Sequence, residues 1–250
     1  MRVALFVTCL VDLFRPSVGF ATVRLLERLG AEVVVPPEQT CCGQPAYNNG
    51  DFDAARAIAR QVITAFDGYD HVVVPSGSCA GMLVKHYPEL FRDEPETLAR
   101  AQDLAARTRE LSVLLAESGG ESAVDAHFSG KVAMHDSCSA RRELGVLAEP
   151  RALLDRLGAE RVELKDAETC CGFGGTFCVK YPDISARMVS DKAAAVVASG
   201  AEVLVSGDLG CLMNIAGRLK RMDSTVRVYH LSELLAGMTD VPAIGDGDKP

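Results

Sequence analysis

Thr40-Cys41-Cys42-Gly43 and Thr169-Cys170-Cys171-Gly172 are two copies of one four-residue string, 129 positions apart (169 − 40). A single cysteine stands 32 positions before each cysteine pair (41 − 9 and 170 − 138), and another cysteine follows each pair. Eight of the nine cysteines therefore fall into two matching sets. The sets are Cys9, Cys41, Cys42 and Cys79 in the first copy, and Cys138, Cys170, Cys171 and Cys211 in the second. This repetition predicts an internally duplicated chain.

The segments around the cysteine pairs also repeat in order. The string LLERLGAE at residues 25–32 returns as LLDRLGAE at residues 153–160. Short apolar runs that alternate with helical patterns predict parallel βαβ units with right-handed crossovers. Strands are expected at residues 3–7, 31–35, 71–74 and 131–134, and helices at about residues 16–29, 51–66 and 96–117. The predicted fold class is α/β, with two duplicated Rossmann-like halves that have parallel sheets and a pseudo-two-fold relation.

We expect the first cysteine-rich repeat at residues 1–121, the second at 122–240, and a flexible tail at 241–250. In each half every cysteine motif lies just beyond a predicted strand. Because sites in open α/β sheets form at the carboxyl ends of the strands, four thiols that are distant in sequence should meet at one sheet edge.

Composition excludes several classes of function. A formal net charge of −8 argues against a nucleic-acid surface. The longest apolar runs have the length of strands, so no membrane span is predicted. The apolar residues after Arg2 are interrupted by Asp12 and Arg15, without a cleavage site, which argues against a signal peptide. We therefore expect a cytoplasmic protein, where cysteines serve as metal ligands or redox groups rather than as structural disulfides.

Four clustered thiolates can hold zinc or an iron–sulfur cluster. Structural zinc sites usually take CxxC pairs, and this chain has none. Directly adjacent cysteines suit a larger object with several metal atoms, which favours an iron–sulfur cluster over zinc. The remaining interpretation is that the cysteines are small buried apolar residues, and two matching sets of four argue against it.

The doubled pattern of a lone cysteine, a Cys-Cys-Gly string and a later cysteine resembles the cysteine-rich (CCG) domain of iron–sulfur oxidoreductase subunits. The strings at residues 75–82, 135–145 and 170–177 are most similar to the lactate utilization A subgroup. The resemblance covers the chain to about residue 238.

This resemblance implies an iron–sulfur cluster, [4Fe-4S] in type, with one or two per chain on the eight cysteines. It implies an electron-transfer component of a system that oxidises L-lactate to pyruvate. The chain would be an oxidoreductase subunit that acts with the other subunits of a lactate-oxidation complex, and the assembly would bind lactate. The alternatives are a thiol–disulfide oxidoreductase like heterodisulfide reductase, or a non-enzymatic metal-binding subunit. Catalytic residues are not identified.

The chain departs from the fullest family motif, in which each repeat ends in CxxC. Counting 37 positions from the cysteine pair, the first repeat keeps Cys79, the first cysteine of that motif. The second repeat has Asp208 at this place and keeps only the last cysteine, Cys211. One cluster per half, one cluster in one half, and one shared cluster all stay open. We expect Asp208 to cap the following helix rather than to bind metal, and Cys178 to be a spare thiol.

Several other residues have two interpretations. His135 and Asp136 either donate hydrogen bonds to cluster sulfur or order their loop. The glycines around the second pair either allow close approach of a cluster or form a plain turn. The other histidines show no ligand spacing and are expected at the surface or in packing: His71, His86, His127 and His230.

Overall fold

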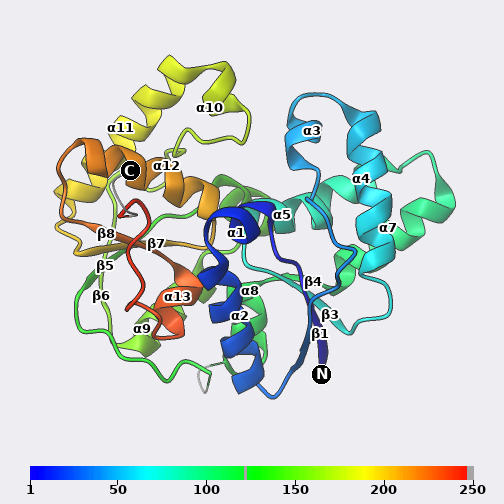
Figure 1. The fold of residues 1–250 in the computed structure, drawn as a ribbon, viewed down its shortest axis with the longest axis horizontal. Helices are drawn as coiled ribbons and strands as arrows, with labels where there is room; N and C mark the ends of the chain where they lie inside the picture. Colours follow the sequence, from blue (N-terminus) through cyan, green and yellow to red (C-terminus); the bar gives the residue numbers. More distant parts are fainter. Residues whose placement is uncertain (121–122, 247–250) are drawn as a thin grey trace.

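The computed structural model describes residues 1–120 and 123–246, which form two four-stranded sheets with helices around them (Figure 1). The strands of the first sheet are β1 (Arg2–Leu5), β2 (Glu32–Val34), β3 (His71–Val74) and β4 (Thr108–Glu110). Those of the second sheet are β5 (Lys131–Met134), β6 (Glu160–Val162), β7 (Val203–Ser206) and β8 (Arg227–His230).

Both sheets have the same topology. Their strand orders are β2-β1-β3-β4 and β6-β5-β7-β8, and every neighbouring pair is parallel. In each sheet the second strand lies on one side of the first strand, and the third and fourth strands lie on the other side. The direction in which strands are added therefore changes between β1 and β3 in the first sheet, and between β5 and β7 in the second. The carboxyl ends of those central strands are where an open α/β sheet forms its site. The prediction of two duplicated α/β halves with parallel sheets is confirmed.

The helices connect the strands and cover both faces of each sheet. The first half contains α1 (Cys9–Phe14), α2 (Pro16–Arg28), α3 (Gln44–Asn48), α4 (Phe52–Ala65), α5 (Gly77–Gly81), the π-helical turn η1 (Met82–His86), α6 (Tyr87–Leu90), α7 (Pro95–Arg107) and α8 (Leu111–Glu117). The second half contains the π-helical turn η3 (Ala140–Leu144), α9 (Ala148–Leu157), α10 (Phe177–Lys180), α11 (Pro182–Ala198), α12 (Leu209–Arg221) and α13 (Leu231–Leu235).

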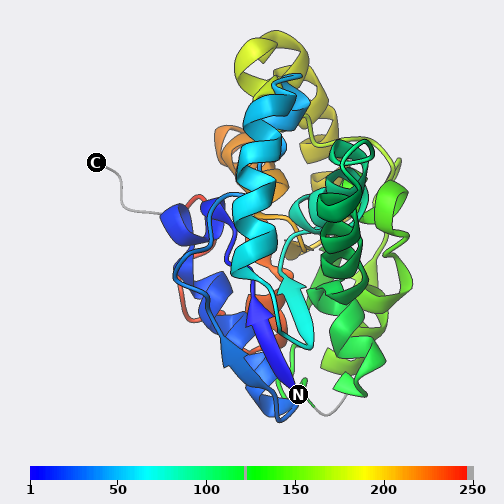
Figure 2. The same cartoon turned by 90° about the vertical axis from the view of Figure 1, so that its right-hand side faces the viewer.

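One apolar core is shared by both halves, and each half also has a core of its own. Alternate residues of a strand contribute to the shared core and to the core of their own half, because successive side chains point to opposite faces of a sheet. Val73 and Val205 face the shared core, where α2 packs on α13 and α8 packs on α9. Val72 and Val74 face the first half's outer layer. Figure 2 shows α4 and α7 of that layer standing in front of β1 and β3. The shared core joins the halves into one body.

The expectation of a single helix over residues 96–117 is wrong. Helix α7 ends at Arg107, and residues 108–110 form strand β4 beside β3. The Glu110 carboxylate then accepts a hydrogen bond from the Ser112 N–H and starts α8. A three-residue strand between two helices has too few residues to show a period of two. The pairing that it gains from β3 outweighs the local helical preference.

The proposed boundary between the halves at residues 121 and 122 lies outside the described residues, as do residues 247–250 of the expected tail. In the described part of that tail, the Ile244 N–H donates to the Val228 carbonyl oxygen at 2.8 Å. The Arg15 guanidinium donates to the Pro242 carbonyl oxygen at 2.7 Å. None of the helices that the structure describes is long and apolar enough to cross a membrane.

Candidate metal centre

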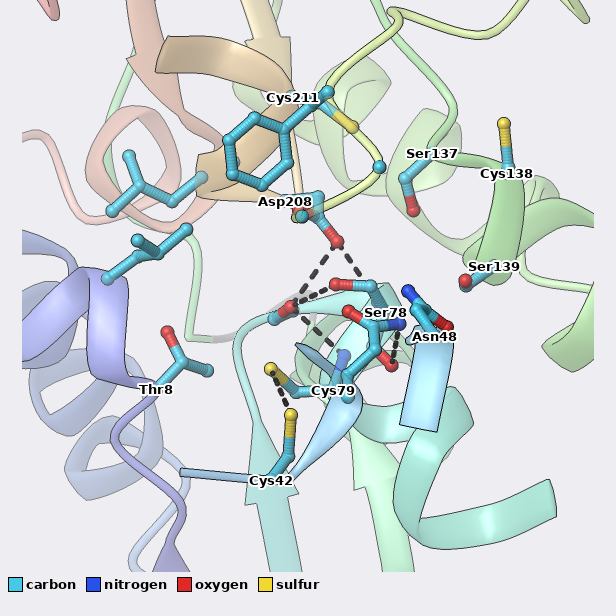
Figure 3. Close-up of a pocket in the computed structure, with 18 of the residues that line it drawn as sticks. Thr8, Cys42, Asn48, Ser78, Cys79, Ser137, Cys138, Ser139, Asp208 and Cys211 are labelled. Carbon is cyan, nitrogen blue, oxygen red and sulfur yellow. Dashed lines mark hydrogen bonds between the residues drawn. The ribbon is translucent and has the colours of Figure 1, made fainter. Parts of the chain in front are cut away.

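All eight cysteines of the two sets line one cavity of about 370 Å³. The cavity lies between the two halves, beyond the carboxyl ends of the central strands of both sheets. Figure 3 shows Cys42 and Cys79 on one side of Asp208, and Cys138 and Cys211 on the other. The structure therefore brings together the thiols that we expected at two sheet edges, and it turns the two edges towards each other.

The lone cysteine of each half begins a short helical turn. Thr8 caps α1 by accepting a hydrogen bond from the Val11 N–H, which places Cys9 at the first helical position. Ser137 does the same for the turn after β5, where its hydroxyl accepts from the Ala140 N–H at 3.3 Å. The same kind of cap therefore places the lone cysteine of each half at the start of a helical turn that faces the cavity.

The two Cys-Cys-Gly strings have the same backbone geometry. Gly43 and Gly172 have φ angles of 80° and 81°, in the left-handed region that favours glycine. A Cβ atom on Gly172 would lie 2.8 Å from the Ser185 carbonyl oxygen. The glycine N–H in each string points back at the first cysteine of the pair, at 3.4 Å from the Cys41 sulfur and 3.3 Å from the Cys170 sulfur. Glycine therefore provides both the turn and a hydrogen bond to a sulfur atom.

Cys79 and Cys211 occupy equivalent places, which corrects the counting from the cysteine pairs. Each is three residues after the N-terminal cap of its helix, Ser76 for α5 and Asp208 for α12. They are 132 positions apart (211 − 79), against 129 for the pairs (170 − 41). The three extra residues equal the difference in length between the intervening helices, because α11 has 17 residues and α4 has 14. The two halves therefore present the same four cysteine positions, rather than different remnants of CxxC.

The thiols of each set form a chain of sulfur contacts. In the first half Cys9 contacts Cys41, Cys41 contacts Cys42, and the Cys42 and Cys79 sulfur atoms are 3.3 Å apart. Hydrogen bonds from the thiols of Cys42 and Cys9, together with the Gly43 N–H, lower the pKa of Cys41 to about 2. The same contacts raise the pKa values of Cys9 and Cys42.

The second half repeats this pattern. Contacts from Cys138 and Cys171 lower the pKa of Cys170 to about 2, and the pKa values of Cys138 and Cys171 are raised. Cys171 in turn contacts Cys211. In each half one thiolate is therefore held by neighbouring thiols that keep their protons. A bound cation would favour the thiolate form of every one of them.

Asp208 links the two halves, and this differs from the expected role. Its backbone is the cap of α12, but its carboxylate makes no bond to that helix. The carboxylate instead accepts hydrogen bonds from the Ser78 N–H at 3.0 Å and from the Ser76 hydroxyl at 3.3 Å (Figure 3). A residue of the second half thus caps the helix that carries Cys79 of the first half.

Two further residues on the cavity wall were missed. His86 was expected at the surface or in packing, but its ring lines the cavity, and its Nε2 atom lies 3.4 Å from a Glu143 carboxylate oxygen of the other half. This pairing raises the pKa of His86 and lowers that of Glu143. Neither residue belongs to a repeated string, so only the assembled fold could identify the pair. Cys178 is not part of the cavity wall, and its thiol donates to the Gly175 carbonyl oxygen.

The donor set fits a thiolate-bound metal group. Four sulfur atoms per half lie in contact or near contact, and backbone N–H groups point at the first cysteine of each pair. Cys171, Cys211 and His135 form a compact group, whose potential ligand atoms all lie within 4.8 Å of one another. Within residues 1–120 and 123–246, no Arg or Lys lines the cavity. Soft sulfur donors of this kind select iron–sulfur clusters, zinc or copper(I) rather than magnesium or calcium.

Comparison with known proteins identifies relatives of the whole chain. Residues 3–84 and 132–216 each match a family described as "Cysteine-rich domain". Two relatives are named lactate utilization protein A: one from Bacillus velezensis is 50% identical over 94% of this chain and 99% of its own length, and one from Bacillus subtilis is 48% identical over the same shares. A third, from Macrococcus caseolyticus and with the same name, is 48% identical over 94% of this chain and 96% of its own.

Proposed function

The chain belongs to the cysteine-rich domain family, together with the proteins named lactate utilization protein A, and on this basis we propose that it is an iron–sulfur electron-transfer subunit of a lactate-oxidising system. The proposal includes a [4Fe-4S]-type group on the cysteines of each half, a cytoplasmic location and further subunits as partners. The oxidation of L-lactate to pyruvate releases two electrons and two protons. In this proposal the chain accepts the electrons from a partner subunit and passes them on.

The observation that carries the proposal is the convergence of eight thiols on one cavity between the halves. Two thiol sets on opposite walls of a single cavity provide two neighbouring places for electrons. Cys9, Cys41, Cys42 and Cys79 would hold one group, and Cys138, Cys170, Cys171 and Cys211 the other. A bound cluster would supply one-electron redox chemistry at each place.

The lining of the cavity supports electron transfer rather than lactate oxidation within this chain. A lactate carboxylate is best held by Arg or Lys, and neither residue type lines the cavity. The histidine and the two carboxylates among the described lining residues already have partners: His86 is paired with Glu143, and Asp208 accepts hydrogen bonds from Ser76 and Ser78. We therefore infer that lactate binds to a partner subunit and that only electrons reach these cysteines.

Anaerobic purification tests the proposal. The protein should contain iron and acid-labile sulfide and should give an electron paramagnetic resonance (EPR) signal after dithionite reduction. Lactate should produce that signal only after addition of an extract from lactate-grown cells that lack this chain. Zinc or empty thiols under strictly anaerobic conditions would contradict the proposal. Cleavage of an added disulfide by the reduced protein, without any response to lactate, would instead identify a thiol–disulfide oxidoreductase.

A further inference from the structure

His135 and Phe6 occupy the same backbone position in the two halves. Each directly follows the first strand of its sheet, and they are 129 positions apart (135 − 6), as the cysteine pairs are. The Phe6 N–H donates to the Val73 carbonyl oxygen at 2.9 Å, and the His135 N–H donates to the Val205 carbonyl oxygen at 2.8 Å. The side chains at this position therefore point the same way relative to the thiols, but only one of them can bind a metal.

The two rings have different surroundings. Phe6 is fully buried and packs on Phe66, with ring centroids 5.3 Å apart. His135 is 1% exposed, and neither of its ring nitrogens has a hydrogen-bond partner among the residues that the structure describes. A buried polar atom without a partner is destabilising, so an imidazole with two such nitrogens indicates that a group which it binds, such as a metal ion, is missing.

A metal ion could bind at a definite place beside His135. One ring nitrogen of His135 and the sulfur atoms of Cys171 and Cys211 all lie within 4.8 Å of one another. A metal ion bound to cysteine lies about 2.3 Å from sulfur and about 2.0 Å from imidazole nitrogen. Small side-chain adjustments would therefore let the three atoms share one metal ion.

The layer behind the second site is polar as well. Lys192 is buried and donates to the carbonyl oxygens of Asp166 and Ala167 at 3.2 Å, whereas the corresponding residue of α4 is the fully buried Val62. The buried positions of the two helices match at an offset of 130, so that Ala59 corresponds to Val189 and Val62 to Lys192. The second half has thus gained a buried imidazole and a buried ammonium group beside its thiols.

We propose that His135 is a metal ligand of the second half, so that a mixed cysteine and histidine site faces an all-cysteine site across the cavity. This inference rests on the proposed function, because it requires the second half to bind a metal group. A neutral imidazole adds no negative charge, and histidine ligands raise the potential of iron–sulfur centres relative to thiolates. Where His135 takes the place of one thiolate on the metal group, that group carries one negative charge fewer and the second site is the more oxidising of the two, so electrons that enter the first site move towards it.

Pulsed EPR on the anaerobically prepared protein tests the inference without reference to activity. Wild-type protein is prepared with natural-abundance histidine and with ¹⁵N-histidine, then reduced with dithionite or by γ-irradiation in frozen solution. We expect a strong ¹⁴N coupling that changes to ¹⁵N on labelling and that disappears in His135→Gln. In His86→Gln, which alters the histidine that lines the cavity, the coupling should remain.

The reciprocal variant sharpens the test. Phe6→His places an imidazole at the matching position of the first half and should add a second nitrogen coupling. Iron-containing wild-type protein without any strong histidine coupling, or a coupling that survives in His135→Gln, would overturn the inference and leave the proposed function intact. Protein that contains no iron would overturn both. If His135→Gln does not fold, the labelled wild type and His86→Gln still decide the result.

Discussion

The two halves share the framework that positions the thiols and differ in the layer directly behind it. Capping hydroxyls, left-handed glycines and helix N-termini recur at matching positions, as Thr8 and Ser137 show. At three matching positions near the strands and helices of each half, the first half has Phe6, Val7 and Val62, and the second has His135, Asp136 and Lys192. The positions that set geometry have therefore been retained, whereas the positions that set charge have diverged. The same four cysteines can then serve two different electronic roles.

The equivalence of the two cysteine sets can be tested by removing one cysteine from each. Cys41→Ala and Cys170→Ala each delete the thiolate that lies at the centre of its chain of sulfur contacts. If each half binds its own group, each variant should lose about half of the iron and sulfide, because the ligands of the other half stay intact. Chemical analysis of anaerobic protein measures this loss. Complete loss in both variants would indicate one shared group, and loss in only one variant would show that one half alone binds it.

A buried ion pair distinguishes the second half. The Asp136 carboxylate is 1% exposed and accepts two hydrogen bonds of 2.9 Å from Arg151, at the position of Val7 in the first half. Arg151→Ala would leave the buried carboxylate with only the more distant Arg141, so the free energy of unfolding should fall by about 3 kcal/mol. Urea denaturation of the metal-free protein measures this change.

Arg28→Ala is the matched control for that variant. Its partner Asp125 is 62% exposed, so the loss should be below about 1 kcal/mol. The double variant Asp136→Val, Arg151→Leu carries apolar residues in place of the pair and should recover most of the stability. Equal losses in Arg151→Ala and Arg28→Ala would contradict the role given to the buried pair.

The N-terminal cap residues of α8 and α13, Glu110 and His230, occupy matching positions in the two halves, and their pKa values are shifted in opposite directions. Burial raises the pKa of Glu110 from 4.5 to about 7, whereas burial lowers the pKa of His230 at the matching cap. Folded Glu110 therefore keeps a proton that the unfolded chain releases above pH 4.5. This contribution to stability is complete below pH 4.5 and is lost as the pH rises through 7, by about 3 kcal/mol in all.

Urea denaturation at a series of pH values checks this sign. The stability of the wild type relative to Glu110→Gln should decline between pH 4.5 and 7, because glutamine does not titrate and the contributions of the buried histidines cancel in the difference. The same comparison in a His230→Gln background should show the same decline, since the lowered pKa of His230 acts below pH 6.5 with the opposite sign and cancels in the difference. An unchanged pH profile in Glu110→Gln would show that another group is responsible.

The smallest predicted effect concerns the carbonyl of the second cysteine in each pair. In the first half the Tyr87 hydroxyl donates to the Cys42 carbonyl oxygen at 2.9 Å, and in the second half the Asn214 amide donates to the Cys171 carbonyl oxygen at 2.9 Å. Tyr87→Phe leaves a buried carbonyl without this partner and should cost about 1–2 kcal/mol. Thermal or urea unfolding measures the loss, and exposed Tyr181→Phe should cost almost nothing. A loss in Tyr181→Phe as large as that in Tyr87→Phe would contradict the prediction.

Local patterns predict the repeated framework well and the contacts between halves poorly. The duplication, the central strands and the convergence of the thiols follow from strings and apolar runs, because each depends on residues near one another in sequence. The equivalence of Cys79 and Cys211 was missed, since an insertion between the cysteine pair and the strand shifts any count from the pair. Strand register and the helix caps, which fix those cysteines in space, are known only from the fold.

Contacts that cross between the halves have no local signal. His86 and Glu143 meet across the cavity from turns that differ in sequence, and neither residue has a counterpart of its own type in the other repeat. The carboxylate of Asp208 was expected on its own helix because an aspartate before a helix usually caps it. A better-placed set of donors in the other half, at Ser76 and Ser78, attracts it instead.

The meeting of Ser76 and Asp208 has a consequence for the ancestry of the chain. These two residues are equivalent caps, so their contact lies where an unfused pair of identical subunits would bring one residue against its own copy. Two aspartates there would repel each other, and two serines would leave the helix of Cys79 without a charged acceptor. Two copies that differ in sequence, as the two halves of this chain do, can place a donor on one side and an acceptor on the other. The difference between the two halves thus permits an asymmetric pairing that a homodimer could not encode.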